Sequence, residues 1–189
     1  PYFTVRRHYG GHSWVIALAR CPSCGFVFVP EPPAIAYDEH YLHEEGVITG
    51  QDPLEQVRVE GRLNAIARRV PPGPQVRLLD FGIGDGHFLA QAAARGYLPY
   101  GYDINPAGFA LAQELYGLTA EFSSAPLAEA FPATLFDIIH LNEVIEHLAE
   151  PLVVLRWCAD HLRPGGLLVV KTGNIRSLAA RIMGRRWIY

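Results

Sequence analysis

The sequence predicts an α/β protein with a doubly wound, mostly parallel sheet and a small β element at its amino-terminal end. Strand-like apolar runs alternate with helical patterns from Val76 to Gly173, which is typical of strands joined by crossover helices. A turn with three glycines, Gly82–Gly86, directly follows the first of these runs. The chain has 189 residues, of which 50% are hydrophobic and 19% charged, so it can build one ordinary core plus an appendage.

The first part of the chain reads as a β element followed by an irregular stretch. Within residues 1–30, the runs "HSWVIALARC" and "GFVFVP" are rich in aromatic and β-branched residues and flank the turn "CPSCG". Residues 31–53 are proline-rich and acidic, which indicates a linker or lid. We therefore expect three parts: a β-hairpin at 1–30, the linker or lid at 31–53 and a ligand-binding domain at 54–189.

The remaining elements follow from hydrophobic spacing and from glycine and proline positions. Apolar residues of 54–70 follow helical spacing until "PPGP" stops the helix. The expected strands are 76–82, 97–104, 118–124, 136–142 and 167–173, and the expected helices are 87–96, 106–117, 150–166 (ending at a Pro-Gly stop) and 176–187. This alternation predicts a parallel sheet covered on both faces.

Composition narrows the classes of partner and compartment. The net charge of −3, with fifteen arginines and the single lysine Lys171, does not indicate a nucleic-acid partner. No apolar run is long enough for a membrane span, and residues 1–20 do not resemble a signal peptide. Three cysteines are too few for a disulfide scaffold, so we expect a cytoplasmic protein. The sequence does not predict the oligomeric state.

Both ends of the chain suggest a piece of a longer protein. The chain starts at Pro1 and stops at "GRRWIY", where a helix would be expected to continue. We therefore expect the sheet to be truncated at its carboxyl-terminal end.

The glycine loop is the strongest candidate for a ligand site. A turn between a strand and a helix lies at the carboxyl edge of the sheet, where open α/β folds bind ligands. The dinucleotide fingerprint G-x-G-x-x-G needs a third glycine at position 87, but His87 stands there and the third glycine is Gly86. Asp80 would place negative charge beside a pyrophosphate. The loop therefore favours a ligand that carries positive charge.

Five segments together resemble one family. "LLDFGIGDGHF" resembles the first motif of the Rossmann-like, S-adenosylmethionine (SAM)-dependent methyltransferases, and "YGYDINP" resembles their second motif. "FDIIHLNEVIEHLAEP" and "LRPGGLLVV" are similar to the fourth and fifth strand segments. "RCPSCGFVFVPEPP" and the later "YDEHY" resemble the start of a subgroup with a cysteine-bearing, zinc-ribbon-like element. The likeness covers almost the whole chain and implies SAM as the cofactor.

The resemblance also implies a set of cofactor-binding residues. The backbone of Gly82–Gly84 would hold the methionine end, Asp80 would lie near the positive part, Asp103 would bind both ribose hydroxyls and Ile104 would pack on adenine. The whole implied set is Asp80, Phe81, Gly82, Gly84, Gly86, Asp103, Ile104, Ser124, Ala125 and Asn142. The alternatives are a tight turn for the glycines, a helix-capping acid for Asp103 and a simple polar loop at 124–125.

The segment "NEVIEHL" offers a proton acceptor or a metal site. On a helical turn Glu143, Glu146 and His147 would share one face and could converge on a divalent metal. An E-x-x-E-H set binds metal in some methyltransferases with a further histidine, which this sequence lacks after His161. We therefore favour a site without metal, in which Glu146 and His147 line the pocket. His147 is the expected catalytic proton acceptor, followed by His140.

Cys21 and Cys24 form half of a potential zinc site. Two thiolates in C-x-x-C spacing can share one tetrahedral ion, which needs two more ligands. His8 and His12 could supply them, or a matching C-x-x-C could precede Pro1, because members of the subgroup resemble a four-cysteine ribbon. The alternative is a pair of free thiols in a hairpin turn. Cys158 is most simply a core residue.

Two further segments allow a functional and a structural interpretation. His40 and His43, beside Tyr37 and Tyr41, could form part of a lid over the acceptor, or they could be surface aromatics. The basic segment "RSLAARIMGRRW" is more typical of a helix with a solvated arginine face than of an RNA site.

The expected function is methyl transfer from SAM to a small-molecule acceptor such as a sugar nucleotide, a quinone precursor or another metabolite. One alternative is an NAD(P)-dependent oxidoreductase, against which the residue at position 87 argues. The other is a non-catalytic module in which the zinc element and the SAM domain bind a protein partner.

Overall fold

The computed structural model describes residues 3–9, 12–30, 50 and 52–184, with the backbone alone for 3–9 and 12–16. The contacts divide the chain into two compact units: Pro1–Ala36 with Gly173–Tyr189, and Tyr37–Thr172. Within the described ranges no helix is both long and apolar enough to cross a membrane. The expected lid residues, Tyr37, His40, Tyr41 and His43, lie outside the described residues.

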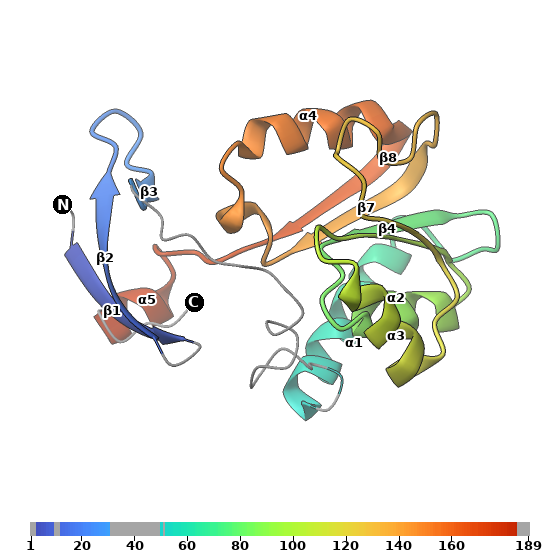
Figure 1. Ribbon diagram of the computed structural model, residues 1–189, viewed down its shortest axis with the longest axis horizontal. Coiled ribbons are helices and arrows are strands. Elements are labelled where there is room, and N and C mark those ends of the chain that lie inside the picture. Colours follow the sequence, from blue (N-terminus) through green and yellow to red (C-terminus); the bar gives the residue numbers. More distant parts are fainter. Residues whose placement is uncertain (1–2, 10–11, 31–49, 51, 185–189) are drawn as a thin grey trace. The chain divides into compact units, whose positions relative to one another are not determined.

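The first unit contains the small β element that the sequence predicts. Strands β1 (Phe3–Tyr9), β2 (His12–Arg20) and β3 (Val27–Phe28) form an antiparallel sheet in that order (Figure 1). The same unit contains α5 (Leu178–Met183), which begins where the Ser177 hydroxyl accepts a hydrogen bond from the Ala180 N–H at 3.1 Å. The segment after the last strand of the larger sheet thus groups with the amino-terminal strands.

The second unit contains a parallel five-stranded sheet in the order β6-β5-β4-β7-β8, which confirms the predicted fold class. Its elements are α1 (Pro53–Ala67), β4 (Arg77–Phe81), α2 (His87–Ala94), β5 (Leu98–Tyr102), α3 (Ala107–Tyr116), β6 (Glu121–Ser123), β7 (Phe136–Asn142), the 3-10 turn η2 (Ile145–His147), α4 (Pro151–His161) and β8 (Leu162–Lys171). β4, the strand before the glycine loop, lies at the centre of this sheet. The glycine loop therefore opens at the middle of the sheet's carboxyl edge.

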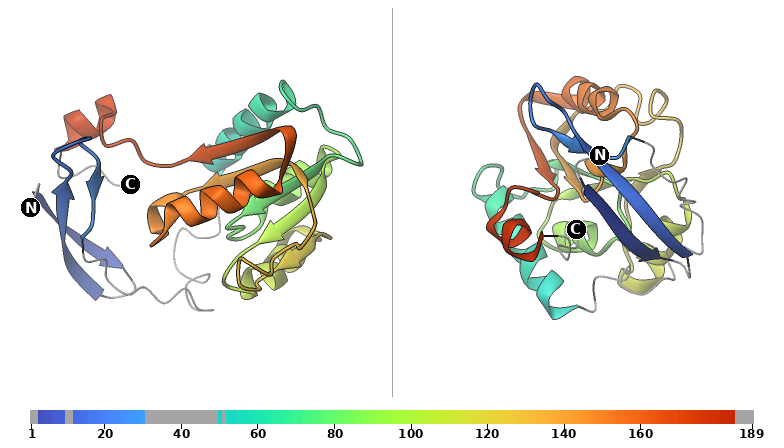
Figure 2. Two further views of the ribbon diagram at one scale, coloured as in Figure 1. Left: turned by 90° about the horizontal axis from the view of Figure 1, so that it is seen from above. Right: turned by 90° about the vertical axis from the view of Figure 1, so that its left-hand side faces the viewer.

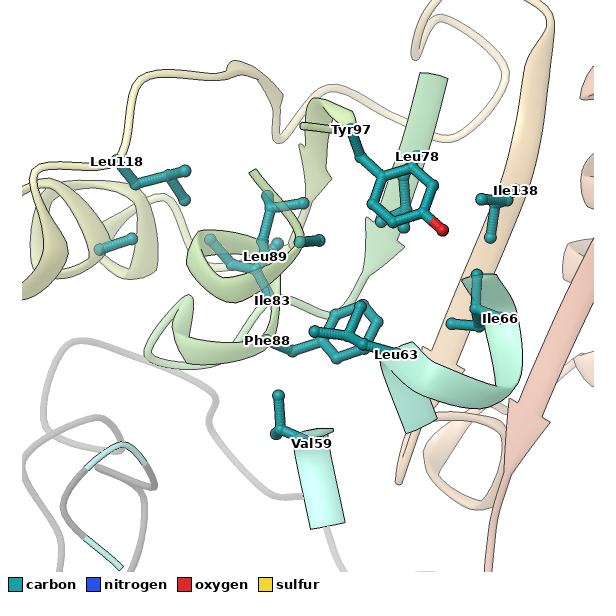
Figure 3. Packing of buried hydrophobic residues seen from close by; sticks show 12 residues of the cluster. Val59, Leu63, Ile66, Leu78, Ile83, Phe88, Leu89, Tyr97, Leu118 and Ile138 are labelled. Atoms are coloured by element: carbon teal, nitrogen blue, oxygen red, sulfur yellow. The ribbon is translucent and has the colours of Figure 1, made fainter. Parts of the chain in front are cut away.

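Helices cover both faces of this sheet because successive residues of its buried strands point to opposite sides. On one side Leu78 and Ile138 pack with Leu63 of α1 and Leu89 of α2, and all four side chains are fully buried (Figure 3). On the other side the apolar residues of β4 and β7 pack with Val154, Trp157 and Cys158 of α4. Figure 1 shows α4 across the sheet from α1, α2 and α3, and Figure 2 shows α4 running alongside β7 and β8.

The boundaries of the helices follow local sequence signals. The Asp52 carboxylate accepts a hydrogen bond from the Leu54 N–H at 2.9 Å, and Pro53 occupies the first turn of α1. Helix α3 ends at Gly117, which adopts a left-handed φ of 61°.

Two local expectations were wrong. The helix before the last strand ends at His161 rather than at the Pro-Gly pair, because Leu162 already pairs with Phe136 of β7. Residues 163–166 lie in a register shift, after which Leu167 pairs with Ile138. The second concerns "NEVIEHL": only Ile145–His147 form a helical turn, and Glu143 precedes it with a left-handed φ of 56°. Glu143 therefore does not share a helical face with Glu146 and His147.

Candidate functional site

A cavity of about 390 Å³ opens at the carboxyl ends of β4, β5 and β7. Eight of the residues predicted from the sequence line it: Asp80, Phe81, Gly82, Gly84, Asp103, Ile104, Asn142 and His147. Gly86, Ser124 and Ala125 are not among its lining residues. The central strands thus bring most of the predicted cofactor residues to one place.

The glycine loop forms the wall of this cavity. Gly82 donates its N–H to the Tyr102 carbonyl at 2.7 Å, which ties the loop to β5. Its φ is 84°, and a Cβ there would lie 2.5 Å from Cγ2 of Val144. Gly84 has a φ of 54° with no heavy atom within 4 Å of a built Cβ, so its side of the loop is open. A ligand can therefore approach the backbone at Gly84 closely.

Gly86 has a different environment from the other two loop glycines. It precedes α2 with a φ of 78°, and a Cβ there would lie 2.4 Å from the Cβ of Ala112 in α3. The absence of a side chain lets α2 and α3 approach each other. Contact between Gly86 and a cofactor stays a prediction.

Asp103 directly follows β5 and faces the glycine loop. Its carboxylate accepts hydrogen bonds from the backbone N–H of Asn105 at 2.9 Å and of Gly84 at 3.4 Å. Burial, which is the largest effect, raises the pKa of the Asp103 carboxyl, and the nearby Asp80 raises it further. The neighbouring Ile104 is 64% exposed on the cavity wall. A half-buried acceptor and an exposed apolar side chain thus lie side by side.

Asp80 and His140 form a buried pair in the cavity. They are register partners on β4 and β7, and Nδ1 of His140 lies 2.7 Å from Oδ1 of Asp80. The His140 ring stacks on Phe88 of α2, with ring centroids 3.7 Å apart. The sequence did not predict this pair, because Asp80 and His140 lie 60 positions apart and were assigned separate roles.

Helix α1 contributes an arginine that the sequence prediction missed. Arg62 and Glu55 both line the cavity, and Nη2 of Arg62 forms a salt bridge with Oε1 of Glu55 at 2.7 Å. The guanidinium carbon of Arg62 lies 5.8 Å from the centroid of the Phe88 ring. Within the described part of the chain, Nε of Arg62 is buried and has no hydrogen-bond partner. Arg62 lies between the buried residues Val59 and Leu63 in the sequence, and a charge beside a buried helical stripe is a signal that could have identified it.

The three residues considered for metal binding have different surroundings. Glu143 lines the cavity and pairs with Lys171 at the end of β8, whereas His147 lines the cavity with an exposed side chain. Glu146 is exposed and is not a lining residue. Among the described residues, no group of three or more His, Cys, Asp or Glu side chains is arranged to hold a metal ion.

Asp85, in the glycine loop, links three segments. Its buried carboxylate accepts hydrogen bonds from the backbone N–H of Gly50 at 3.1 Å, the hydroxyl of Tyr116 at 3.0 Å and the N–H of His87 at 3.1 Å. Burial, then the charge of Asp85, raises the pKa of the Tyr116 hydroxyl. Asp85 thus connects the chain before α1 to the loop and to α3.

Cys21 and Cys24 belong to the first unit and lie in the turn between β2 and β3. Gly25 closes this turn with a φ of 74° and donates its N–H to the Cys21 carbonyl at 3.0 Å. Hydrogen bonding to the backbone at Cys24, followed by that at Ser23, lowers the pKa of the Cys21 thiol. The side chains of His8 and His12 lie outside the described residues.

Solved structures share the fold of this chain. The chain is similar to the N-methyltransferase NodS from Bradyrhizobium japonicum in complex with S-adenosyl-L-homocysteine, with a TM-score of 0.60, 22% identity and coverage of 70% of this chain and 69% of that one. It is also similar to CalS10, a SAM-bound amino pentose methyltransferase from Micromonospora echinaspora, with a TM-score of 0.58, 24% identity and coverage of 76% and 60%. At these identities the likeness shows the fold.

The sequence is similar to curated methyltransferases and matches a family model. The chain is 36% identical over 124 residues to a ubiquinone biosynthesis O-methyltransferase from Cereibacter sphaeroides, covering 62% of this chain and 50% of the relative. It is 33% identical over 138 residues to the enzyme of that name from Parvibaculum lavamentivorans, covering 69% and 54%. The chain thus spans about half the length of these relatives. Residues 42–189, well over half of the chain, match the methyltransferase domain family, and the chain therefore belongs to that family.

Proposed function

We propose that this chain forms a SAM-dependent methyltransferase site that acts on a small-molecule acceptor. The observation that carries the proposal is the half-buried Asp103 carboxylate directly after β5, which lies on the cavity wall beside the open backbone of Gly84. A carboxylate there can accept hydrogen bonds from two neighbouring hydroxyls of a ribose. SAM-bound and SAH-bound relatives of the same fold add support.

The size of the cavity and the chemical groups that line it support this proposal. Its volume of about 390 Å³ lies in the usual range for small-molecule sites. Asp103 would hold the ribose, Ile104 would pack on the adenine and the backbone at Gly84 would face the methionine part. Arg62 would bind the cofactor's carboxylate, because its buried Nε has no partner within the described part of the chain. Two acidic residues, Asp80 and Asp103, suit a ligand with a positive sulfur.

The chain's own residues would act mainly by alignment. Bound SAM supplies a methyl group on a positively charged sulfur, which is transferred by direct displacement. The residues around the cavity would align the acceptor with that methyl group and exclude water. A proton acceptor is needed only for a hydroxyl or an acidic carbon. His147 is proposed for this role because its exposed imidazole on the cavity wall can reach an acceptor, whereas His140 is fully buried.

The acceptor is proposed to be a small metabolite with a hydroxyl or amine group. The curated relatives carry the name ubiquinone biosynthesis O-methyltransferase, and two structural relatives are an amino pentose methyltransferase and the sugar N-methyltransferase KedS8. The net charge of −3 gives no support to a nucleic-acid partner. The three free cysteines support a cytoplasmic location.

We further propose that residues 1–30 form a zinc-ribbon-like element, with 31–53 as a linker or lid and 54–189 as the methyltransferase domain. The turn at Cys21 and Cys24 supports the first part, since a lowered thiol pKa favours the thiolate that binds zinc. Replacing both cysteines by serine should remove zinc that copurifies with the protein, as measured by elemental analysis. Protein without zinc before any substitution would contradict this part.

Calorimetry with SAM and with SAH tests the main proposal. The wild-type protein should bind both, and Asp103→Asn should weaken binding by about tenfold or more, because a hydrogen bond between an ionised group and its partner is lost. Asp160→Asn, a matched change at an exposed position of α4, should leave affinity unchanged. Absence of binding, or an unchanged affinity for Asp103→Asn, would contradict the proposal. If NADH raised the thermal unfolding temperature more than SAM does, the oxidoreductase alternative would be favoured.

A further inference from the structure

Gly50 is fixed at the glycine loop from three sides. Its N–H donates to the Asp85 carboxylate at 3.1 Å, and its carbonyl accepts a hydrogen bond from Nε2 of Gln56 at 2.9 Å. The hydroxyl of Tyr116 donates to the same oxygen of Asp85 at 3.0 Å. A side chain at position 50 would collide with this hydroxyl. Asp85, Tyr116 and Gly50 therefore form one anchor, which requires glycine at position 50.

The anchor meets the glycine loop beside the cavity. Asp85 lies between Gly84, whose backbone is open to a ligand, and Gly86, which packs against α3. The Asp85 carboxylate is buried, and it also accepts the His87 N–H at 3.1 Å. Because donors from several segments satisfy this buried carboxylate, the network holds those segments in one arrangement.

Among the residues that the structure describes, apolar packing does not hold the first half of α1. No described residue from 52 to 58 is buried, and Leu54 and Val57 are 66% and 68% exposed. The first buried residue of α1 is Val59, which begins the stripe that packs in the core (Figure 3). The first turn of α1 is therefore held mainly by the anchor.

The first turn of α1 also carries the partner of Arg62. Oε1 of Glu55 forms a salt bridge with Nη2 of Arg62 at 2.7 Å, and both residues line the cavity. Glu55 lies close to Gly50 in the sequence, so a shift of the anchored segment moves Glu55 and with it the guanidinium of Arg62. The contacts thus run from Tyr116 and Asp85 through Gly50 and Glu55 to Arg62.

We propose that Tyr116 is a positioning residue for the cofactor. Through Asp85 and Gly50 it holds the first turn of α1 so that Arg62 meets the cofactor's carboxylate. This inference rests on the proposed function, in which Arg62 binds that carboxylate. Without the anchor, α1 starts in several positions, and only a fraction of the molecules presents Arg62 correctly. The apparent affinity for the cofactor is then reduced by that fraction.

Calorimetry with SAH tests the role of Tyr116 through its dependence on Arg62. Tyr116→Phe removes the hydroxyl alone and should weaken SAH binding by about threefold to tenfold. Gly50→Ala, which breaks the anchor from the other side, should weaken binding to a similar extent. In an Arg62→Gln background, Tyr116→Phe should change the affinity by about twofold or less, because the group that it positions is already absent.

Tyr97→Phe is the matched control. The buried Tyr97 donates its hydroxyl to the Val70 carbonyl at 2.7 Å, beyond the other end of α1, and Tyr97 is not among the lining residues of the cavity. This variant also loses one hydrogen bond of a tyrosine hydroxyl, but it should bind SAH like the wild-type protein.

The outcomes distinguish this inference from the proposed function. An unchanged SAH affinity for Tyr116→Phe would overturn the inference and leave the proposed function intact. An equal loss with and without Arg62, or an equal loss in Tyr97→Phe, would show a general structural effect and would also overturn the inference. If the wild-type protein does not bind SAH, the proposed function fails, and the inference fails with it.

Discussion

Replacing Gly86 by alanine tests the interpretation that the third loop glycine serves the contact between two helices. The new Cβ would lie 2.4 Å from the Cβ of Ala112 and 3.3 Å from its Cα, and the backbone φ is 78°. Both features oppose a side chain at this position. Gly84→Ala is the matched comparison, because its φ is 54° but no heavy atom lies within 4 Å of the added Cβ.

The free-energy difference between the two variants follows from these contacts. A left-handed backbone costs an alanine about 1–2 kcal/mol, and this cost applies to both positions. Overpacking against Ala112 adds about 1–3 kcal/mol at position 86 alone. Gly86→Ala should therefore lower the free energy of unfolding by about 2–5 kcal/mol, and Gly84→Ala by about 1–2 kcal/mol.

Urea unfolding followed by circular dichroism measures both values. The additional change Ala112→Gly removes the atom that the new side chain would meet, so the double variant should lose less stability than the two single variants predict together. Equal losses for Gly86→Ala and Gly84→Ala, or strictly additive losses in the double variant, would refute the helix-contact interpretation.

Three further predictions concern stability and pH. Burial raises the pKa of the Asp103 carboxyl, so the folded protein binds a proton there more tightly than the unfolded chain does. Protonated Asp103 therefore adds stability to the folded state. This contribution is complete below the unfolded-state pKa and is lost as the pH rises through the folded-state pKa. Asp103→Asn should thus be at least as stable as the wild type at pH 7, with an advantage that shrinks in acid; a less stable variant in urea unfolding at pH 7 would contradict this. Leu63→Ala should lower the free energy of unfolding by about 2–5 kcal/mol, since Leu63 is fully buried, and a loss under 1 kcal/mol would argue against its core position. Tyr116→Phe should lower it by about 1–3 kcal/mol, because the buried Asp85 carboxylate loses a donor; unchanged thermal unfolding would show that this bond contributes nothing.

Most of the sheet could be predicted from the sequence because its signals are local. Strand β7 matches the expected strand, and α1 and α3 begin and end within a few residues of their expected limits. Their apolar spacing, together with Pro53 and Gly117, acts within one or two turns of chain. Eight predicted site residues line the cavity for a related reason: the carboxyl ends of neighbouring parallel strands meet at one edge.

The missed features depend on contacts between distant segments. Asp80 and His140 meet only because β4 and β7 pair in one register. Arg62 reaches the cavity only because α1 packs beside α2. The helical interpretation of "NEVIEHL" was wrong at Glu143, where the pairing with Lys171 and a left-handed backbone take its side chain away from the turn. Sequence spacing alone carries none of this information.

A crystal structure of the protein grown with SAH tests the central claim most directly. The account predicts the nucleoside in the cavity beside the glycine loop, with both ribose hydroxyls within about 3 Å of the Asp103 carboxylate oxygens. A nucleoside bound elsewhere, or one whose ribose makes no hydrogen bond to Asp103, would contradict it.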